Sequence, residues 1–98
     1  LLLYSHFDVQ PVDPLELWTS SPFEPTERNG KLFARGSADD KGQGYILLAV
    51  LEGFLKTSGK LPVNVKVLFE GEEESSGEHI EEYVHKHAAE LGCSAAVV

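Results

Sequence analysis

Sulfur and positive charge are both scarce in this sequence. Its 98 residues include no Met and one Cys, Cys93, and only 8 Lys and Arg residues stand against 16 Asp and Glu residues. A lone Cys cannot form an internal disulfide, and its thiol is compatible with a reducing compartment. The formal net charge of −8 repels phosphate groups. Nucleic acids and anionic membranes are therefore poor partners for this chain.

Long apolar runs are also missing, since no stretch approaches the roughly 18 residues that a membrane span needs. The hydrophobic content of 42% is nevertheless normal for a globular protein and argues against disorder. A chain of 98 residues provides one domain at most. It begins "LLLYSHF" without an initiator Met and closes on "SAAVV", and both ends have the composition of a buried strand. We therefore expect residues 1–98 to be part of a longer protein, cut at both ends.

The first third of the sequence predicts a strand, a loop and a hairpin. Residues 1–4 are apolar, which suits a strand buried on both faces. His6 and Asp8 then lie where this strand would end. A Pro-rich segment follows, and Asn29-Gly30 marks a hairpin turn.

The remaining sequence predicts two helices and two further strands. Apolar residues recur on one helix face from Asp40 onwards, and Gly59 marks the end of that helix. Residues 63–69 alternate with the two-residue period of a strand, residues 80–91 form a second helical stripe, and "SAAVV" begins the last strand. Two possible capping boxes start the helices, Asp40 with Gln43 and Ser75 with Glu78.

This order of elements predicts an α/β fold with a largely parallel sheet. Strands that alternate with helices are typically joined by right-handed crossovers, and ligands then bind beyond the carboxyl ends of the strands. Two polar segments fall at such ends, one around His6 and one at the acidic turn, residues 70–74. We expect the functional site there.

Pairs of polar residues at these positions have two interpretations. His6 and Asp8 point to the same side of an extended chain, so Asp8 can accept the second ring N–H of a metal-bound imidazole. A His and an Asp that merely end a strand are the plainer interpretation. Asp39 and Asp40 precede the first helix, where one Asp is explained as an N-cap and the other is not. A carboxylate that bridges two divalent cations would explain the second.

The acidic turn strengthens the metal hypothesis. Seven carboxylates lie between Glu70 and Glu82. Those of the second helix suit its solvated face, but the four from Glu70 to Glu74 gather at the end of a strand. Like charges buried together either acquire strongly raised pKa values or require cations. Divalent metal ions account for this turn most economically.

Three segments in order resemble the hallmark segments of the M20 metallopeptidases, the family of aminoacylases, cytosolic dipeptidases and carnosinases. They are "SHFDVQPV", "LFARGSADDKG" and "EGEEESSG". The string "LWTSSPFEPTERNGKLFARGSADDKG" is most similar to the dipeptidase branch. The resemblance implies that residues 1–98 are the first part of a three-layer α/β/α zinc-peptidase-like catalytic domain. The remaining metal ligands and the lid or dimerisation domain would lie outside this sequence.

The resemblance also implies a role for each site residue. His6 would be a ligand of one metal ion, Asp8 would orient it, and Asp39 would bridge both ions through a carboxylate followed by a cis peptide bond. Glu73 would be the general base and Glu74 a ligand of the second ion. A shift of the alignment by one residue would move the last two roles.

The function implied is hydrolysis of dipeptides or short peptides by water activated by two divalent ions, Zn²⁺ or else Mn²⁺ or Co²⁺. The full-length protein would be a cytoplasmic homodimer that binds neither nucleic acid nor membrane. Deacylation of N-acyl amino acids is an alternative within the family, and an inactive, metal-free scaffold is an alternative outside it. With His6, Asp39 and Glu74 alone, each ion has two protein ligands, so we expect residues 1–98 by themselves to bind metal weakly and not to turn over substrate.

Overall fold

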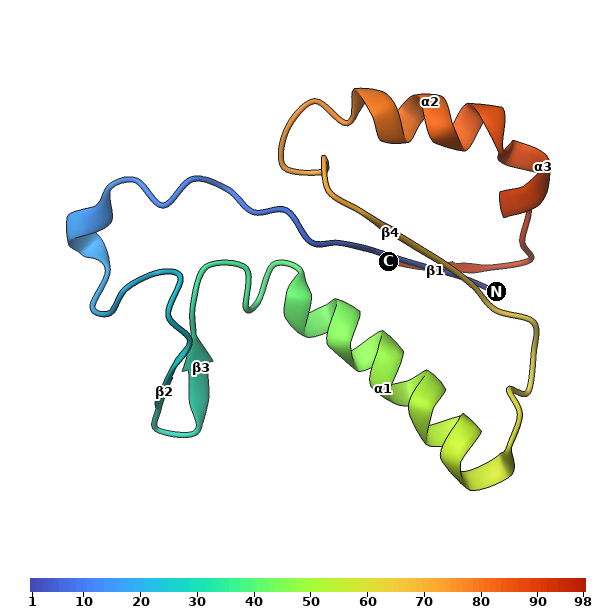
Figure 1. Ribbon diagram of the computed structural model, residues 1–98, viewed down its shortest axis with the longest axis horizontal. Coiled ribbons are helices and arrows are strands. Elements are labelled where there is room, and N and C mark those ends of the chain that lie inside the picture. The colour runs from blue at the N-terminus through green and yellow to red at the C-terminus, as the bar shows by residue number, and fades with distance from the viewer.

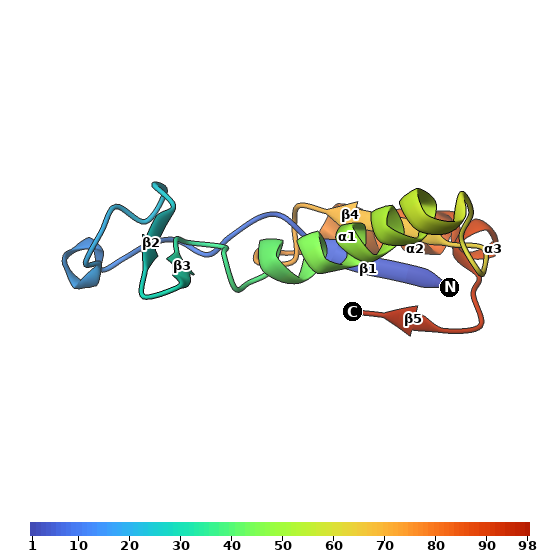
Figure 2. The same ribbon diagram turned by 90° about the horizontal axis from the view of Figure 1, so that it is seen from below.

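A three-stranded parallel sheet forms the centre of the computed structural model, which describes residues 1–98 (Figure 1). β1 (Leu2–His6) lies in the middle, flanked by β4 (Lys66–Glu70) and β5 (Ala96–Val97). Figure 2 shows the three strands side by side in that order. The parallel sheet predicted from the sequence is confirmed, although β4 begins three residues later than the alternation from residue 63 suggested.

Helices cover both faces of this sheet. In Figure 1 the sheet is seen along its edge, with α1 (Lys41–Ser58) below it and α2 (Glu78–Lys86) and α3 (Ala88–Leu91) above it. This is the expected three-layer α/β/α arrangement. The apolar side of α1 faces the sheet, since Leu47, Leu51 and Phe54 line one cavity together with Leu3 of the central strand. None of the helices has the length and apolarity needed to cross a bilayer.

The strand register brings the two polar segments to one edge of the sheet. His6 pairs with Glu70 at the carboxyl ends of β1 and β4, and the Phe7 N–H extends the ladder by donating to the Glu70 carbonyl oxygen over 2.9 Å. Parallel strands end at the same edge. The His6 segment and the acidic turn therefore start from adjacent points.

The loop after β1 and the hairpin form an arm that extends away from the sheet, at the left of Figure 1. The hairpin joins β2 (Thr26–Arg28) to β3 (Lys31–Phe33). Its turn residues, Asn29 and Gly30, have φ angles of 54° and 72°, as a two-residue hairpin turn requires. This prediction is confirmed. A short 3₁₀ helix, η1 (Leu15–Leu17), lies in the Pro-rich loop and was not predicted.

Both predicted capping boxes are wrong. Neither Asp40 nor Ser75 caps a helix with its side chain, because each has another partner: Asp40 accepts hydrogen bonds from β1, and Ser75 donates to the Glu72 carbonyl oxygen over 3.1 Å. Gly59 does end α1 in the left-handed conformation, with φ of 68°. The stripe over residues 80–91 is divided into α2 and α3 at His87.

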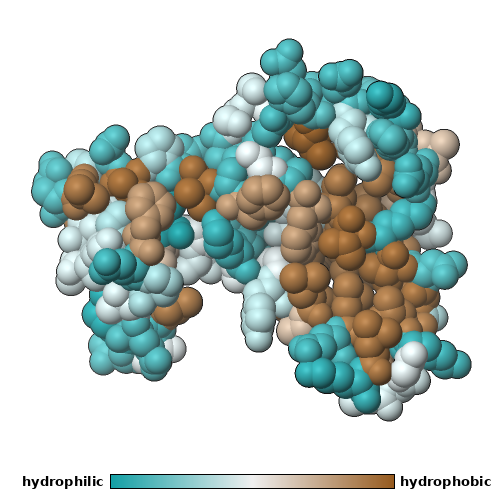
Figure 3. Space-filling model, viewed as in Figure 1, coloured by the Kyte–Doolittle hydropathy of each residue, from teal (hydrophilic) through white to brown (hydrophobic).

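Little of the apolar surface is fully buried. Leu3 in the central strand is the one buried hydrophobic residue, and the radius of gyration of 16.4 Å exceeds the roughly 13 Å of a compact chain of this length. Figure 3 shows a broad apolar surface on the side of the molecule that carries α1. Between α1 and the sheet lies an apolar cavity of about 220 Å³.

Candidate metal centre

Three segments bring one imidazole and two carboxylates together. His6 Nε2, at the end of β1, lies 3.1 Å from Asp39 Oδ1 in the loop before α1. The same nitrogen lies 3.9 Å from Glu73 Oε2 in the turn after β4. His6 is only 7% exposed, whereas Asp39 and Glu73 are 71% and 49% exposed. The structure therefore places two of the other four predicted site residues within 3.9 Å of the His6 Nε2 atom.

Asp8 connects this imidazole to the acidic turn. Its Oδ1 lies 3.2 Å from His6 Nδ1, and its Oδ2 accepts a hydrogen bond from the Glu74 main-chain N–H over 2.9 Å. The contact expected between Asp8 and the imidazole is present. A carboxylate at Nδ1 favours the tautomer whose Nε2 lone pair is free to bind a metal ion.

The Glu74 carboxylate faces a different partner. Its Oε2 accepts a hydrogen bond of 2.6 Å from Gln10 Nε2. In the chain as a whole, no three His, Cys, Asp or Glu side chains lie close enough together to hold one metal ion. Gln10 was missed in the sequence, where its only signal is the spacing of two residues from Asp8 along an extended segment.

Negative charge around His6 controls its protonation. Burial lowers the pKa of His6, but the hydrogen bond to Asp39, the charge of Glu73 and the hydrogen bond to Asp8 outweigh it, so the pKa lies above its ordinary value. The imidazole is thus placed where positive charge is favoured. A divalent cation would meet the same field.

A second hydrogen-bonded pair supports the start of the acidic turn. Glu70 is 7% exposed, and its two carboxylate oxygens accept hydrogen bonds from the Tyr4 hydroxyl over 2.7 Å and from the Glu72 main-chain N–H over 2.5 Å. Burial and the bond to Glu70 raise the pKa of Tyr4. Glu70 is therefore occupied in holding the turn, a role that its place in an acidic run did not reveal.

Glu72 has a different role from the two glutamates that follow it. Its Oε2 accepts hydrogen bonds from the main-chain N–H groups of His79 over 2.9 Å and Ile80 over 3.4 Å, and so it caps α2. Burial acts to raise the pKa of Glu72, but the bonds from His79 outweigh it, and the pKa is lowered. Of the three adjacent glutamates, only Glu73 and Glu74 remain beside His6 and Asp8.

Asp39 and Asp40 are joined by a cis peptide bond, as the family resemblance implied. The Asp40 side chain turns towards β1: its Oδ2 accepts hydrogen bonds from Ser5 Oγ over 2.6 Å and from the His6 main-chain N–H over 3.2 Å. Two consecutive acidic residues therefore contact the end of one strand.

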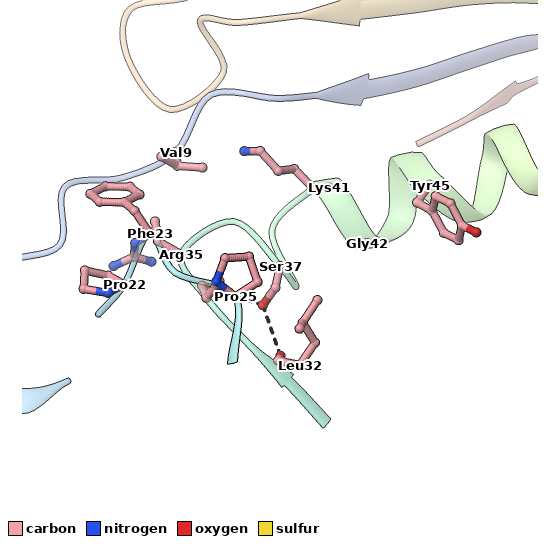
Figure 4. A pocket seen from close by; sticks show the side chains of 11 residues that line it. Val9, Pro22, Phe23, Pro25, Leu32, Arg35, Ser37, Lys41, Gly42 and Tyr45 are labelled. Atoms are coloured by element: carbon pink, nitrogen blue, oxygen red, sulfur yellow. Dashed lines mark hydrogen bonds between the residues drawn. The ribbon is translucent and has the colours of Figure 1, made fainter. Parts of the chain in front are cut away.

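A pocket of about 500 Å³ lies between the arm and the start of α1, lined largely by apolar side chains that include Phe23 and Tyr45 (Figure 4). Its two cations secure the loop after β1, since Lys41 Nζ donates to the Phe7 carbonyl oxygen over 2.7 Å and Arg35 Nη2 donates to that of Pro11 over 3.0 Å. Neither cation pairs with Asp39 or Asp40. Through these two bonds, Lys41 and Arg35 help to fix the segment that carries Asp8.

The two large aromatic residues of the arm, Trp18 and Phe23, have different contacts. Trp18 Nε1 donates to the Val12 carbonyl oxygen over 2.9 Å, and the Arg35 guanidinium lies 5.2 Å from the ring centroid. Trp18 therefore anchors the loop. Phe23 lines the pocket and is 66% exposed.

The profile of the Peptidase family M20/M25/M40 matches residues 2–97. The chain belongs to this family of metallopeptidases. The resemblance based on the three segments around His6, Asp39 and Glu73 is confirmed.

Two curated relatives illustrate the range of the family. Human Beta-Ala-His dipeptidase is 40% identical over 83 residues, which is 85% of this chain and 16% of the relative. Succinyl-diaminopimelate desuccinylase of Xylella fastidiosa is 42% identical over 74 residues, which is 76% of this chain and 20% of the relative. The chain therefore spans about a fifth of the length of the curated proteins that it matches.

A solved structure shows the same fold. The M20 family metallo-carboxypeptidase Sso-CP2 from Sulfolobus solfataricus superposes with a TM-score of 0.91 at 40% sequence identity, covering 98% of this chain and 22% of that chain. By their names, these similar proteins are a dipeptidase, a desuccinylase and a metallo-carboxypeptidase.

Proposed function

We propose that the protein containing this chain hydrolyses peptide bonds in dipeptides or other short peptides with the help of two divalent metal ions. The observation that carries the proposal is the position of His6 Nε2, 3.1 Å from Asp39 and 3.9 Å from Glu73, with Asp8 on the opposite ring nitrogen. Family membership and similarity to a dipeptidase support the reaction class.

The donor set fits such ions. An imidazole nitrogen and carboxylate oxygens suit Zn²⁺, Mn²⁺ or Co²⁺. His6, Asp39 and Glu74 are the residues that would hold these ions, with Asp39 serving both, and further ligands would come from the rest of the protein. When bound, two divalent ions at a site of this kind polarise a substrate carbonyl and lower the pKa of water.

The chain's own residues would orient groups and move a proton. Asp8 holds the imidazole through Nδ1 and the acidic turn through the Glu74 N–H. Glu73 is the proposed general base: its half-exposed carboxylate takes a proton from the attacking water and passes it to the nitrogen of the leaving amine. Water can reach this carboxylate, whereas His6 beside it is buried.

The same site would also serve a deacylase that removes the acyl group of N-acyl amino acids. The similarity to a desuccinylase favours this second candidate, because succinyl removal cleaves an amide bond as peptide hydrolysis does. Pocket residues outside this chain would decide between the two substrates. We also propose that residues 1–98 are part of a larger catalytic domain in a homodimeric, cytoplasmic protein.

Metal removal from the full-length protein tests the proposal. The protein is stripped of metal, titrated with Zn²⁺ or Mn²⁺, and assayed on a panel of dipeptides and N-acetyl amino acids. Glu73→Ala is the variant of interest, and Glu82→Ala, an exposed glutamate of α2, is the matched control.

We expect metal to restore cleavage of dipeptides in the wild type and in Glu82→Ala. Glu73→Ala should retain its metal and lose about 10²–10⁴-fold in kcat, the usual contribution of a general base. Cleavage of the acylated compounds alone would establish the deacylase. If the wild type neither binds metal nor hydrolyses dipeptides or N-acetyl amino acids, the inactive scaffold is the function that remains.

A further inference from the structure

Asp40 occupies the N-cap position of α1 without acting as its cap. An Asp in this position ordinarily accepts a hydrogen bond from an N–H group in the first turn of its own helix. Here the carboxylate turns away from the helix and accepts from Ser5 Oγ over 2.6 Å and from the His6 N–H over 3.2 Å. The side chain therefore connects the start of α1 to the end of β1.

The surrounding residues are shaped around this contact. Ser5 is 2% exposed, so its hydroxyl depends on a protein partner. Gly44, one turn into α1, is also buried, and a Cβ atom there would lie 2.5 Å from Ser5 Oγ. The absence of a side chain at Gly44 leaves the space in which Ser5 reaches Asp40.

Neighbouring contacts show what the connection achieves. Asp40 binds the main chain of His6, while the preceding residue, Asp39, contacts the His6 ring at 3.1 Å. We propose that Asp40 is a positioning residue, which through Ser5 and the His6 N–H holds the Asp39 carboxylate opposite the His6 imidazole. This inference rests on the proposed function, because it assigns Asp40 to the assembly of that metal centre.

The test compares variants of the full-length protein in three measurements. Asp40→Ala removes both bonds, Asp40→Asn keeps one acceptor oxygen, and Ser5→Ala removes only the hydroxyl. Thr57→Ala is the control, because it deletes a hydrogen bond of 2.7 Å to Gly53 at the far end of the same helix. The measurements are the Asp39 Oδ1 to His6 Nε2 distance in metal-free crystals, the Zn²⁺ affinity by chelator competition, and the Tm.

We expect the distance to lengthen and Zn²⁺ affinity to fall roughly 10–100-fold in Asp40→Ala, the usual effect of losing a group that orients a ligand. Ser5→Ala and Asp40→Asn should show smaller changes of the same kind, and Thr57→Ala should change only the Tm. The two milder variants decide the question by the same criteria if Asp40→Ala does not fold.

A lower Tm with an unchanged distance would overturn the proposal and leave Asp40 as an ordinary stabilising residue. Failure of the proposed function has a different signature, since the wild type would then bind no Zn²⁺. The distance in the metal-free crystals would still decide whether Asp40 positions Asp39.

Discussion

The two sides of the candidate metal centre are built differently. On the β1 side, His6 is 7% exposed, and both of its ring nitrogens and its main-chain N–H have carboxylate partners. On the opposite side, Asp39 and Glu73 are 71% and 49% exposed. One side is held by the protein, and the other is surrounded by solvent.

This difference has a physical reason. A buried polar group must have its hydrogen bonds satisfied within the protein, which fixes its geometry. Like-charged carboxylates tolerate each other more easily where water screens them. The buried side thus sets the direction of the imidazole, whereas the exposed carboxylates would be free to adjust if a cation bound there. Rotation of the Glu74 carboxylate away from Gln10 would be one such adjustment.

Asp8→Asn should have the largest effect on metal affinity, because Asp8 contacts both the His6 ring and the acidic turn. An Asn has one acceptor oxygen, and if that oxygen accepts from the Glu74 N–H, the side-chain NH₂ group faces His6 Nδ1. That group can only donate to Nδ1, which favours the tautomer whose proton is on Nε2 and removes the lone pair that a metal ion needs. We expect Zn²⁺ affinity to fall roughly 10–100-fold, or about 1.4–2.8 kcal/mol. Chelator competition on the full-length protein measures the change.

The control for this variant is Asp13→Asn, which removes one carboxylate from an exposed position in the Pro-rich loop. It changes the net charge by the same amount and should leave the affinity unaltered. Equal losses in the two variants would show that overall charge, rather than the orientation of His6, governs metal binding.

Local patterns in the sequence were sufficient for the architecture. The apolar run of β1, the Asn29-Gly30 turn and the stripe of α1 each depend on residues close together in the chain, so periodicity and turn chemistry identified them. The alternation of these elements then placed the site at the carboxyl ends of the strands, where His6 and the acidic turn do meet.

Partners distant in the sequence could not be predicted in the same way. The sequence around Asp40 fits the pattern of a capping box, but the hydrogen-bond partner of its side chain is Ser5, which lies 35 positions away. Glu72 caps α2 from outside the usual box, seven residues before His79. In both cases the carboxylate could accept hydrogen bonds from nearby or from more distant groups. Packing in the folded chain favours the more distant partner, which no local sequence pattern indicates.

Gly44→Ala probes the packing of the buried side and should have the next largest effect. The new Cβ atom would meet Ser5 Oγ at 2.5 Å, which forces the hydroxyl away from Asp40. We expect a destabilisation of about 1 kcal/mol, at the low end of the range for overpacking, because a hydroxyl rotates more easily than main chain moves. Urea unfolding of the full-length protein measures it.

Gly53→Ala is the matched control within the same helix. No atom lies within 4 Å of a Cβ placed there, so the greater helix propensity of Ala should stabilise the protein by roughly 0.5–1 kcal/mol. A gain of stability in both variants would show that Ser5 has room to move and that the contact with Asp40 is not constrained by Gly44.

Glu72→Gln tests the exposed side and should have the smallest effect. Gln keeps one acceptor oxygen for the main-chain N–H groups at the start of α2 but loses the charge that interacts with His79. We expect a lower Tm, by less than Gly44→Ala causes, and an unchanged Zn²⁺ affinity. Glu82→Gln, on the exposed surface of α2, is the control for the lost charge. A fall in affinity in Glu72→Gln alone would move the metal and base assignments one residue towards Glu72, because a residue that only caps α2 has no reason to affect the ion.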